Sequence, residues 1–284
     1  RKKFDGWHRF NVHRPKAEEM ILRILPSTLA EETIWAPPSK SIMQRIVAVA
    51  TLAQGKTMIA RPSESDDCTN ALMMAAQLGA EVELGEDAIA IQGRFPLKPR
   101  TTNLTPGESG LGLRMFGVLA SLHDSPLTLT RSGSLLSRHL RDFAGALGEF
   151  GVHVKHATPG QHPTVQGPLQ GKEVHLDVSG SSQVLTGLLC ALAHAQADST
   201  LHLHGVVSRP YVQMTLEVLE DMAIKIEVLE ENAQERTWTL RVPGNQRAQA
   251  LDVAIDGDWS AAAFLLGPGA LCAPHHLNLS LIHI

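Results

Sequence analysis

The 284-residue sequence contains few cysteines and no long apolar run. Its three cysteines, Cys68, Cys190 and Cys272, stand far apart and form no Cys-x-x-Cys pair. This pattern indicates a reducing compartment and gives no support for a disulfide framework or a thiolate metal site. No apolar run approaches the roughly 18 residues that a bilayer span requires, and the N-terminus lacks the apolar core of a signal peptide. We therefore expect a cytoplasmic protein with no membrane partner.

Basic charge is also in short supply. Lys and Arg number 25 against 29 Asp and Glu, which gives a net charge of −4. A general nucleic-acid-binding protein would be basic overall, so we expect no nucleic-acid partner. Apolar residues make up 43% of the chain and charged residues 19%, which is typical of globular proteins rather than disordered ones. The length allows one large domain or two smaller ones.

Familiar nucleotide and metal motifs are absent as well. The stretch QGKT at residues 54–57 lacks the upstream glycine of a phosphate loop and follows an expected helix instead of preceding one. GESGLG at residues 107–112 is not a dinucleotide fingerprint, because no acidic residue ends a following strand at the right distance. His202 and His204 share one face of an expected strand, but no cysteine or carboxylate stands at ligand spacing. We expect no metal ion and no cofactor.

Short strands alternate with helices of about three turns along the chain. Apolar residues recur at positions i, i+3, i+4 and i+7 in the expected helices, residues 42–52, 68–78, 111–122, 136–150, 183–195 and 212–222. The expected strands between them are residues 57–60, 82–84, 88–92, 127–130, 152–155, 174–178, 200–204, 225–229 and 238–242. The pattern predicts an α/β fold.

One arrangement recurs along the chain. A helix that ends in a short LG or FG corner leads to a strand in AAQLGAEVEL and LGEFGVHV, and more loosely in LEDMAIKIEVL. These segments are about 70 residues apart, and each is followed by a second strand. The spacing indicates a threefold internal repeat in which each copy holds two helices and several strands. It favours a threefold α/β domain over a doubly wound sheet.

Four expected helices begin with more polar chemistry than a core requires. Helix N-termini offer unpaired N–H groups and a positive dipole end, which suit phosphate or carboxylate, although each stretch alone is also explained by ordinary capping. The four stretches are Ser39-Lys40-Ser41 with Arg45, PGESGLGLRMF at residues 106–116 with Arg114, SGSSQVLTGLL from Ser179, and SRPY at residues 208–211.

Lys40 carries the wrong charge for a helix N-terminus, where a nearby anion would resolve the conflict. Arg45 and Arg138 add guanidinium groups, which make planar two-point contacts with anions. Together these groups predict a site for a small molecule with several negative charges. Asp67 belongs to an acidic helix start in SESDDCTNAL, and the helix dipole already explains acidic residues at that place. Asp67 could also orient a basic group in the site.

Taken together, these stretches closely resemble the 3-phosphoshikimate 1-carboxyvinyltransferases, or EPSP synthases. The resemblance covers roughly residues 20–266 and rests on PPSKSIMQR, SDDCTNAL, GESGLGLRMF, SGSSQVLTGLL, SRPYVQMTLEVL and IDGDWSAAAF, all in family order. The related UDP-N-acetylglucosamine enolpyruvyl transferases have Lys-Asn in place of Lys-Ser and lack SRPY, so they match less well. The resemblance implies the enolpyruvyl transferase fold, in which two domains of three βαβαββ units each enclose a cleft.

The resemblance also implies how the chain divides. Residues 1–19 are polar and without period, and we interpret them as non-native sequence or an upstream leader. Residues 20–37 would supply strand structure to the second domain, and residues 38–252 would form the first domain with its three repeats. Residues 253–284 would begin a truncated second domain and end in an artefactual tail, its helix stopping at Gly267.

The implied reaction joins the enolpyruvyl group of phosphoenolpyruvate to the 5-hydroxyl of shikimate-3-phosphate and releases phosphate, without a cofactor. Asp256 and Asp258 precede the family's catalytic aspartate and do not match it, and nothing later matches the second domain's catalytic groups. We expect a monomeric enzyme when the chain is complete and no turnover from these residues alone. The alternatives are a one-domain protein that binds phosphorylated metabolites without catalysis, and the UDP-sugar transferase.

The resemblance implies roles for ten residues, carried over one position at a time. Lys40 would be catalytic and would contact both substrates. Shikimate-3-phosphate would be held by Lys40, Ser41, Arg45, Ser181, Ser182, Gln183, Ser208 and Tyr211. Phosphoenolpyruvate would be held by Lys40, Gly110, Arg138 and Gln183, although GESGLGLR departs from the family's commoner Asn-Ala-Gly-Thr form at this place.

Overall fold

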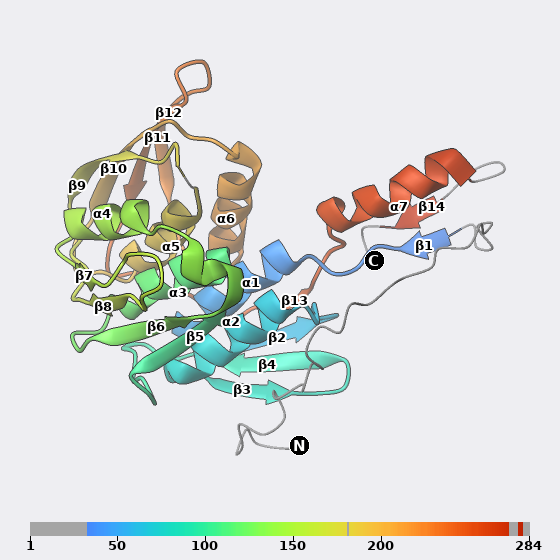
Figure 1. The fold of residues 1–284 in the computed structure, drawn as a ribbon, viewed down its shortest axis with the longest axis horizontal. Helices are drawn as coiled ribbons and strands as arrows, with labels where there is room; N and C mark the ends of the chain where they lie inside the picture. The colour runs from blue at the N-terminus through green and yellow to red at the C-terminus, as the bar shows by residue number, and fades with distance from the viewer. Residues whose placement is uncertain (1–32, 181, 273–277, 281–284) are drawn as a thin grey trace.

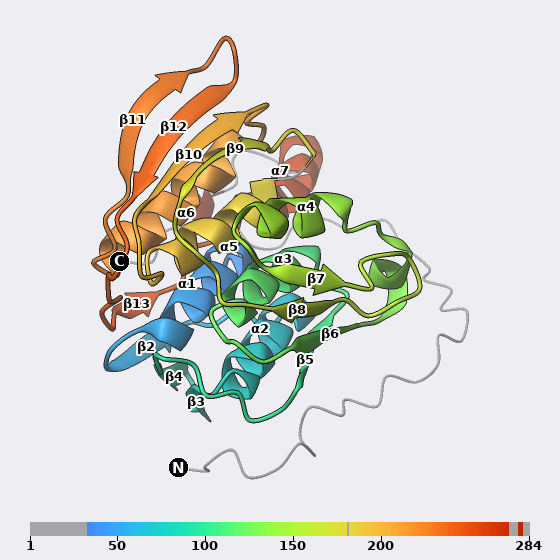
Figure 2. The same ribbon diagram turned by 90° about the vertical axis from the view of Figure 1, so that its left-hand side faces the viewer.

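The computed structural model describes residues 33–180, 182–272 and 278–280. They form a body of three four-stranded sheets around a bundle of helices, and an arm that projects from one side of the body (Figures 1 and 2). The leader predicted over residues 1–19, most of the segment 20–37, Ser181 and most of the tail lie outside the described residues.

Each sheet belongs to one unit of two helices and four strands. The first unit holds α1 (Lys40–Leu52), β2 (Lys56–Ala60), α2 (Asp66–Gln77), β3 (Glu81–Leu84), β4 (Ala88–Gln92) and β13 (Asp252–Ala254). The second holds β5 (Asn103–Gly107), α3 (Gly110–Ala120), β6 (Leu127–Arg131), α4 (Arg141–Glu149), β7 (His153–Lys155) and β8 (Thr164–Gln166). The third holds β9 (Glu173–Asp177), α5 (Ser182–Leu192), β10 (Ser199–His204), α6 (Arg209–Asp221), β11 (Glu227–Asn232) and β12 (Thr237–Val242).

The three sheets share one topology. Their strand orders are β13-β2-β4-β3, β5-β6-β8-β7 and β9-β10-β12-β11, and in each the first pair is parallel and the others antiparallel. The second and third units therefore read βαβαββ along the chain. The first unit takes its outer parallel strand from β13, near the far end of the described chain. The threefold repeat predicted from the sequence is confirmed.

The arm meets the body through two neighbouring connections. It consists of α7 (Trp259–Cys272) and of β1 (Thr33–Trp35) paired in parallel with β14 (Asn278–Ser280). Asp258 donates its main-chain N–H to the Pro37 carbonyl at 2.8 Å, and Ser39 donates to Asp256 at 2.7 Å. The chain therefore leaves and re-enters the body at one place. The predicted domain boundary at residue 252 falls inside β13.

Two helix predictions are wrong in their extent. The helix expected over residues 136–150 is a short 3₁₀ helix, η2 (Gly133–Ser137), followed by extended backbone at Arg138 before α4 begins at Arg141. The helix expected to stop at Gly267 continues through Pro268 to Cys272. Proline fixes its own φ near the helical value, so a helix can pass through it, although the lost hydrogen bond and the crowding of the preceding turn cost about 3 kcal/mol. Strands β5 and β13 were not predicted.

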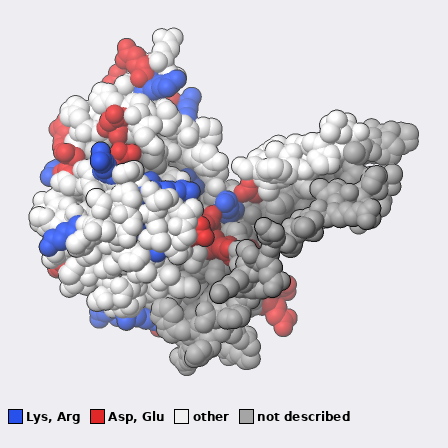
Figure 3. Space-filling view, in the orientation of Figure 1, with Lys and Arg blue, Asp and Glu red and all other residues white. Residues whose placement is uncertain are grey.

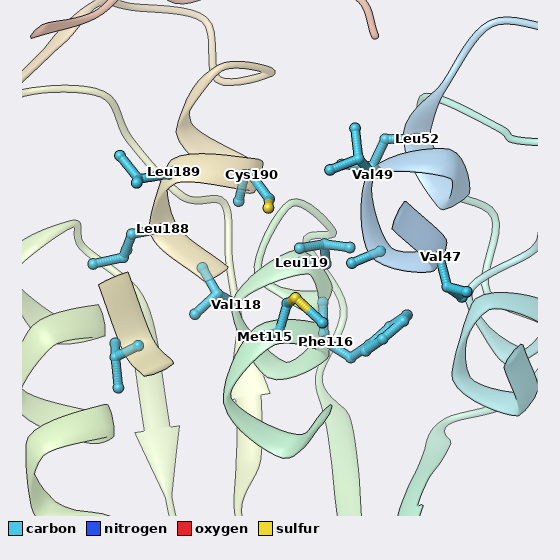
Figure 4. Packing of buried hydrophobic residues seen from close by; sticks show 14 of the residues in the cluster. Val47, Val49, Leu52, Met115, Phe116, Val118, Leu119, Leu188, Leu189 and Cys190 are labelled. Carbon is cyan, nitrogen blue, oxygen red and sulfur yellow. The ribbon is translucent and has the colours of Figure 1, made fainter. Parts of the chain in front are cut away.

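The core lies where the first helix of each unit packs against the others. Helices α3 and α5 are apolar on nearly every face, as buried helices are. A Cβ on Gly187 would lie 2.9 Å from the Val118 side chain, so the missing side chain lets α5 approach α3 closely. Figure 4 shows Met115 and Phe116 of α3 between Leu188 of α5 and Val47 of α1. This bundle aligns the N-termini of its helices.

No helix in the described part of the chain is long and apolar enough to cross a membrane.

The turns that follow α2, α4 and α6 occupy equivalent places in the three repeats and differ in one residue. Helices α2 and α4 are each followed by a glycine in left-handed conformation, Gly79 (φ +113°) and Gly151 (φ +78°). The corresponding residue after α6 is Ala223, with φ +62°. The return hydrogen bond is the same at all three corners, as Ile224 donates to Leu219 at 2.8 Å. An alanine here adopts a conformation that costs about 1–2 kcal/mol.

Ala223→Gly is therefore expected to raise the free energy of unfolding by about 0.5–1 kcal/mol, since the relief of strain exceeds the extra entropy of the unfolded chain. Urea unfolding measures this change. Ala144→Gly, inside α4, is the matched control and should lower the free energy by about 1 kcal/mol. A loss of stability in A223G would contradict the assignment of strain to this corner.

Candidate active site

A cavity of about 640 Å³ opens where the N-termini of four helices converge. Helices α1, α3 and α5 come from the three units, and α6 adds a fourth N-terminus. In Figure 3, basic and acidic side chains lie next to each other in the notch between the body and the arm. The cavity is lined by Lys40, Ser41, Gln44, Arg45, Asp67, Glu108, Ser109, Gly110, Leu111, Arg114, Arg138, Gly180, Ser182, Gln183, Val207, Ser208 and Tyr211.

Lys40 is the first residue of α1 and is ion-paired. Ser39 caps the helix by accepting a hydrogen bond from the Ile42 N–H at 3.4 Å, which leaves Lys40 at the edge of the cavity. Its ammonium lies 3.0 Å from the Asp67 carboxylate. This hydrogen bond raises the pKa of Lys40 above its ordinary value. Lys40 therefore stays protonated and can donate a hydrogen bond into the cavity.

Arg45 lies one turn further along α1 and is almost fully buried, at 2% exposure. Its Nε donates to the Thr215 hydroxyl at 2.9 Å, and its Nη atoms donate to the carbonyls of Ser41 at 2.8 Å and Tyr211 at 3.2 Å. The Thr215 hydroxyl also lies 3.2 Å from that of Thr186 on α5. One guanidinium thus joins α1, α6 and α5 beneath the cavity. Burial lowers the pKa of Arg45.

Two further arginines meet above Gly110, the first residue of α3. Arg114 donates from Nη1 to the Gly110 carbonyl and to the Gln183 side chain, both at 3.2 Å. A Cβ on Gly110 would lie 2.9 Å from Nη1 of Arg138, so the missing side chain makes room for that guanidinium. Burial, and then the charge of Arg138, lowers the pKa of Arg114. An anion at this point would relieve the repulsion between the two arginines.

Ser208 precedes α6 in a strained conformation. Its φ of +57° and ψ of +43° are left-handed, and its hydroxyl makes no capping hydrogen bond to the helix. Strained non-glycine residues of this kind are concentrated at ligand sites. Tyr211 follows on the first turn of α6, 41% exposed, with the Arg45 guanidinium 5.8 Å from the centre of its ring. The cavity therefore has an aromatic wall beside a hydroxyl that does not cap its helix.

Comparison with known proteins decides what this arrangement is. The family model described as EPSP synthase (3-phosphoshikimate 1-carboxyvinyltransferase) matches residues 26–277. The chain belongs to the EPSP synthase family.

Curated relatives in methanogenic archaea bear the same name. The 3-phosphoshikimate 1-carboxyvinyltransferase of Methanocorpusculum labreanum is 34% identical over 242 residues, which are 84% of this chain and 56% of the relative. That of Methanoculleus marisnigri is 32% identical over 259 residues, 89% of this chain and 60% of the relative. The chain thus spans little more than half the length of the curated relatives it matches.

Solved structures agree on the fold. EPSP synthase from Acinetobacter baumannii superimposes with a TM-score of 0.71 at 21% identity, over 84% of this chain and 53% of that one. The enolpyruvyl transferase NikO from Streptomyces tendae gives a TM-score of 0.65 at 17% identity, over 89% and 57%. The fold class implied by the sequence resemblance is confirmed.

The structure brings nine of the ten predicted site residues to this one cavity, and Ser181 lies outside the described residues. Asp67 also lies where the sequence suggested, beside Lys40. These positions agree with the family's binding roles but do not test them.

The sequence analysis gave no role to three polar residues that line the cavity, Gln44, Glu108 and Ser109, and noted Arg114 only as part of a polar helix start. Ser109 caps α3 and donates to the Gln44 side chain at 3.0 Å, and Gln44 in turn donates to the Lys40 carbonyl at 3.2 Å. These bonds fix the start of α3 against α1. Arg114 carried a usable signal, because it lies four residues after Gly110 and therefore on the same face of α3.

The two histidines set aside in the sequence, His202 and His204, lie on the outer face of the third sheet, and the ring of each stacks with that of His175. The rings of His175 and His202 stack at 4.4 Å, and His202 lies 2.8 Å from the Glu173 carboxylate. Among the residues that the structure describes, no group of three or more His, Cys, Asp or Glu side chains is arranged to hold a metal ion.

Proposed function

We propose that this chain binds shikimate-3-phosphate and phosphoenolpyruvate and takes part in transfer of the enolpyruvyl group to the 5-hydroxyl, giving 5-enolpyruvylshikimate-3-phosphate and phosphate. The observation that carries the proposal is the balance of charge in the cavity. Four cationic side chains line it, while of its two carboxylates Asp67 is paired with Lys40 and Glu108 accepts the Ser134 N–H at 2.9 Å. Four helix N-termini add their positive ends. Such a cavity suits ligands with several negative charges.

The two substrates would occupy different ends of the cavity. Shikimate-3-phosphate would lie against α1, α5 and α6, and would be held by Lys40, Ser41, Arg45, Ser181, Ser182, Gln183, Ser208 and Tyr211. Phosphoenolpyruvate would lie at the N-terminus of α3, and would be held by Lys40, Gly110, Arg138 and Gln183. Lys40 and Gln183 stand between the two ends and would contact both ligands.

The chemistry of the reaction suits these groups. Phosphoenolpyruvate gains a proton at C3 while the 5-hydroxyl adds to C2 and loses its own proton. Phosphate then leaves C2 as C3 gives up a proton, which restores the carbon–carbon double bond. The Lys40 ammonium, which lies at the edge of the cavity between the two substrates, is a proton-transfer candidate. Fixed arginines and helix N-termini stabilise the phosphate and carboxylate charges without any cofactor. Removing water from the cavity would strengthen each of these interactions.

The proposal extends to the organisation of the protein. Residues 38–252, with the rest of β13, would form the first domain, residues 20–37 and the chain after β13 would belong to the second domain, and residues 1–19 would lie outside both. The complete protein would act as a monomer in the cytoplasm. The separate strand pair β1–β14 and the paired crossings beside Asp258 support this division.

Calorimetric titration of the chain tests the proposal. Shikimate-3-phosphate is expected to bind, and Lys40→Met is expected to weaken that binding about tenfold, because it removes one charge-assisted hydrogen bond. Lys56→Met is the matched control, since Lys56 also forms a lysine–carboxylate pair, at 2.8 Å from Glu83, but lies outside the cavity. It should leave the affinity unchanged.

Two outcomes would contradict the proposal. Binding of UDP-N-acetylglucosamine in preference to shikimate-3-phosphate would assign the cavity to the UDP-sugar branch. Equal weakening by K40M and K56M would mean that net charge, rather than the cavity, attracts the ligand.

A further inference from the structure

Arg131, at the end of β6, is buried to 2% exposure, and the hydrogen bonds that its guanidinium makes with the described residues all go to main-chain carbonyls. Its Nε donates to Gln161 at 2.9 Å, and its Nη1 donates to Leu135 at 3.2 Å and to Arg138 at 2.9 Å. Its Nη2 donates to Thr158 at 2.7 Å and also to Gln161. A guanidinium has five N–H groups, so these five bonds use all of them.

A buried arginine without a countercharge is expensive. None of the described carboxylates forms an ion pair with Arg131, and burial lowers its pKa. Transfer of an unpaired cation out of water costs several kcal/mol, of which hydrogen bonds to carbonyls return only part. An apolar side chain would fill this space at lower cost. Arg131 is therefore best explained by what its five bonds hold in place.

These bonds join two loops. One is the Arg138 loop, residues 132–140, which includes η2 and connects β6 to α4. The other is the hairpin loop, residues 156–163, between β7 and β8. Gly160 adds a main-chain bond to Leu136 at 2.8 Å. The Arg138 loop is thus bound to the hairpin loop by the hydrogen bonds of Arg131, which lies between them, and by the bond from Gly160.

The Arg138 loop is also held at the cavity. Glu108, just before α3, accepts the Ser134 N–H at 2.9 Å. Gly133 has a φ of +50°, and a Cβ there would overlap the Glu108 carboxylate. Any other residue at this position would need a strained backbone and a displaced Glu108 side chain.

Arg138 depends on this arrangement more than the other cations of the cavity. Lys40, Arg45 and Arg114 project from helices α1 and α3, whose backbones fix them. Arg138 has extended backbone, with φ −78° and ψ +136°, outside any helix or strand. Its own carbonyl is one of the four that Arg131 holds. Loss of Arg131 would release the backbone from which the Arg138 guanidinium reaches across Gly110.

We propose that Arg131 is a positioning residue that fixes Arg138 over the N-terminus of α3 and thereby sets the affinity of that end of the cavity for phosphoenolpyruvate. The inference rests on the proposed function for the identity of the ligand, but the effect on the loop is independent of any ligand. It assigns to a buried side chain outside the cavity a specific effect on one substrate.

The test begins with the ligand-free chain and Arg131→Lys. Lysine keeps the positive charge but offers three donors on a flexible stem, so it cannot hold both loops as the guanidinium does. Amide hydrogen exchange at Ser134 and Arg138 is expected to become about tenfold faster, or ~1.4 kcal/mol less protected. Thr128→Val is the control, because it removes a hydroxyl, 3.2 Å from that of Thr164, from the same strand as Arg131 but outside both loops. It should leave both amides unchanged.

Binding titrations with the two ligands then distinguish a specific effect on Arg138 from a general disruption of the fold. R131K is expected to weaken phosphoenolpyruvate binding about tenfold and to change shikimate-3-phosphate binding less than twofold. Combined with Arg138→Met, R131K should have no further effect, since it acts through Arg138. Unchanged amide exchange, equal weakening for both ligands, or an additive double variant would each overturn the proposal. If the unsubstituted chain binds neither ligand, the proposed function fails, and the exchange at Arg138 alone decides whether Arg131 positions the loop.

Discussion

Arg45→Met is expected to lower the affinity for shikimate-3-phosphate about a hundredfold while changing the free energy of unfolding by less than about 1 kcal/mol. The two effects separate because Arg45 is a buried cation without a carboxylate partner among the described residues. Its burial already lowers its pKa, which shows that the ligand-free fold disfavours the charge. A phosphate in the cavity would supply the missing negative charge.

The small expected change in the free energy of unfolding follows from the hydrogen-bond acceptors that lose their donor when Arg45 is replaced. The Ser41 carbonyl lies in the first turn of α1, and the Tyr211 carbonyl also accepts a hydrogen bond from the Thr215 hydroxyl at 2.9 Å. Removal of the guanidinium therefore leaves dipoles that keep other partners, not a second buried charge. Methionine fills a similar volume with a flexible apolar chain.

Calorimetry and urea unfolding measure the two quantities on the same samples. Arg241→Met is the control, because Arg241 is half-exposed and pairs with Asp198 and Glu227 on the third sheet, outside the cavity. It should change neither quantity appreciably. A loss of several kcal/mol of stability in R45M with little loss of affinity would show that Arg45 is a structural link between helices and not a ligand group.

The sequence predicted the parts of the fold that local chemistry determines. Helices α1, α2, α3, α5 and α6 start within three residues of their predicted positions, since apolar spacing and capping hydroxyls act over single turns. The same locality made the site predictable. Each of the four polar helix starts is visible alone, and the repeat implies that equivalent helix ends meet.

The features that were missed depend on distant contacts. Strand β13 exists because it pairs with β2, where Asp252 lies opposite Met58. The two strands are far apart in the sequence and neighbours in the sheet. Strand β5 contains Pro106 and Gly107, which local rules assign to a turn. The helix predicted over residues 136–150 was wrong because apolar spacing continues through a loop whose shape is set by Gly133 and Arg131. Tertiary contacts override the local pattern at each of these places.

Acid is expected to destabilise the fold by about 3 kcal/mol between pH 6.5 and pH 4 through one buried imidazole. His194, two residues past the end of α5, is 3% exposed. Burial lowers its pKa from 6.5 to about 4, and the charge of Arg247 contributes in the same direction. Its Nδ1 lies 3.1 Å from the Cys190 carbonyl, and its Nε2 has no hydrogen-bond partner among the described residues. The fold therefore selects the neutral ring protonated at Nδ1.

The direction of the effect follows from the order of the two pKa values. Because the folded pKa lies below the unfolded one, below pH 6.5 the unfolded chain binds a proton that the folded chain refuses. The contribution of His194 is thus fully present above pH 6.5. It falls by about 1.4 kcal/mol per pH unit until the folded ring is itself protonated near pH 4.

Urea unfolding from pH 7 to pH 4 distinguishes His194 from the other histidines. His194→Phe keeps an aromatic ring against Phe95, whose centre lies 5.2 Å away, and should remove most of this slope. His153→Gln, at an exposed strand position, should leave the slope unchanged. Equal slopes for H194F and the unsubstituted chain would contradict the prediction. Since Ser182 and Gln183 meet the cavity at the opposite end of α5, H194F should also retain shikimate-3-phosphate affinity, which separates acid stability from the binding site.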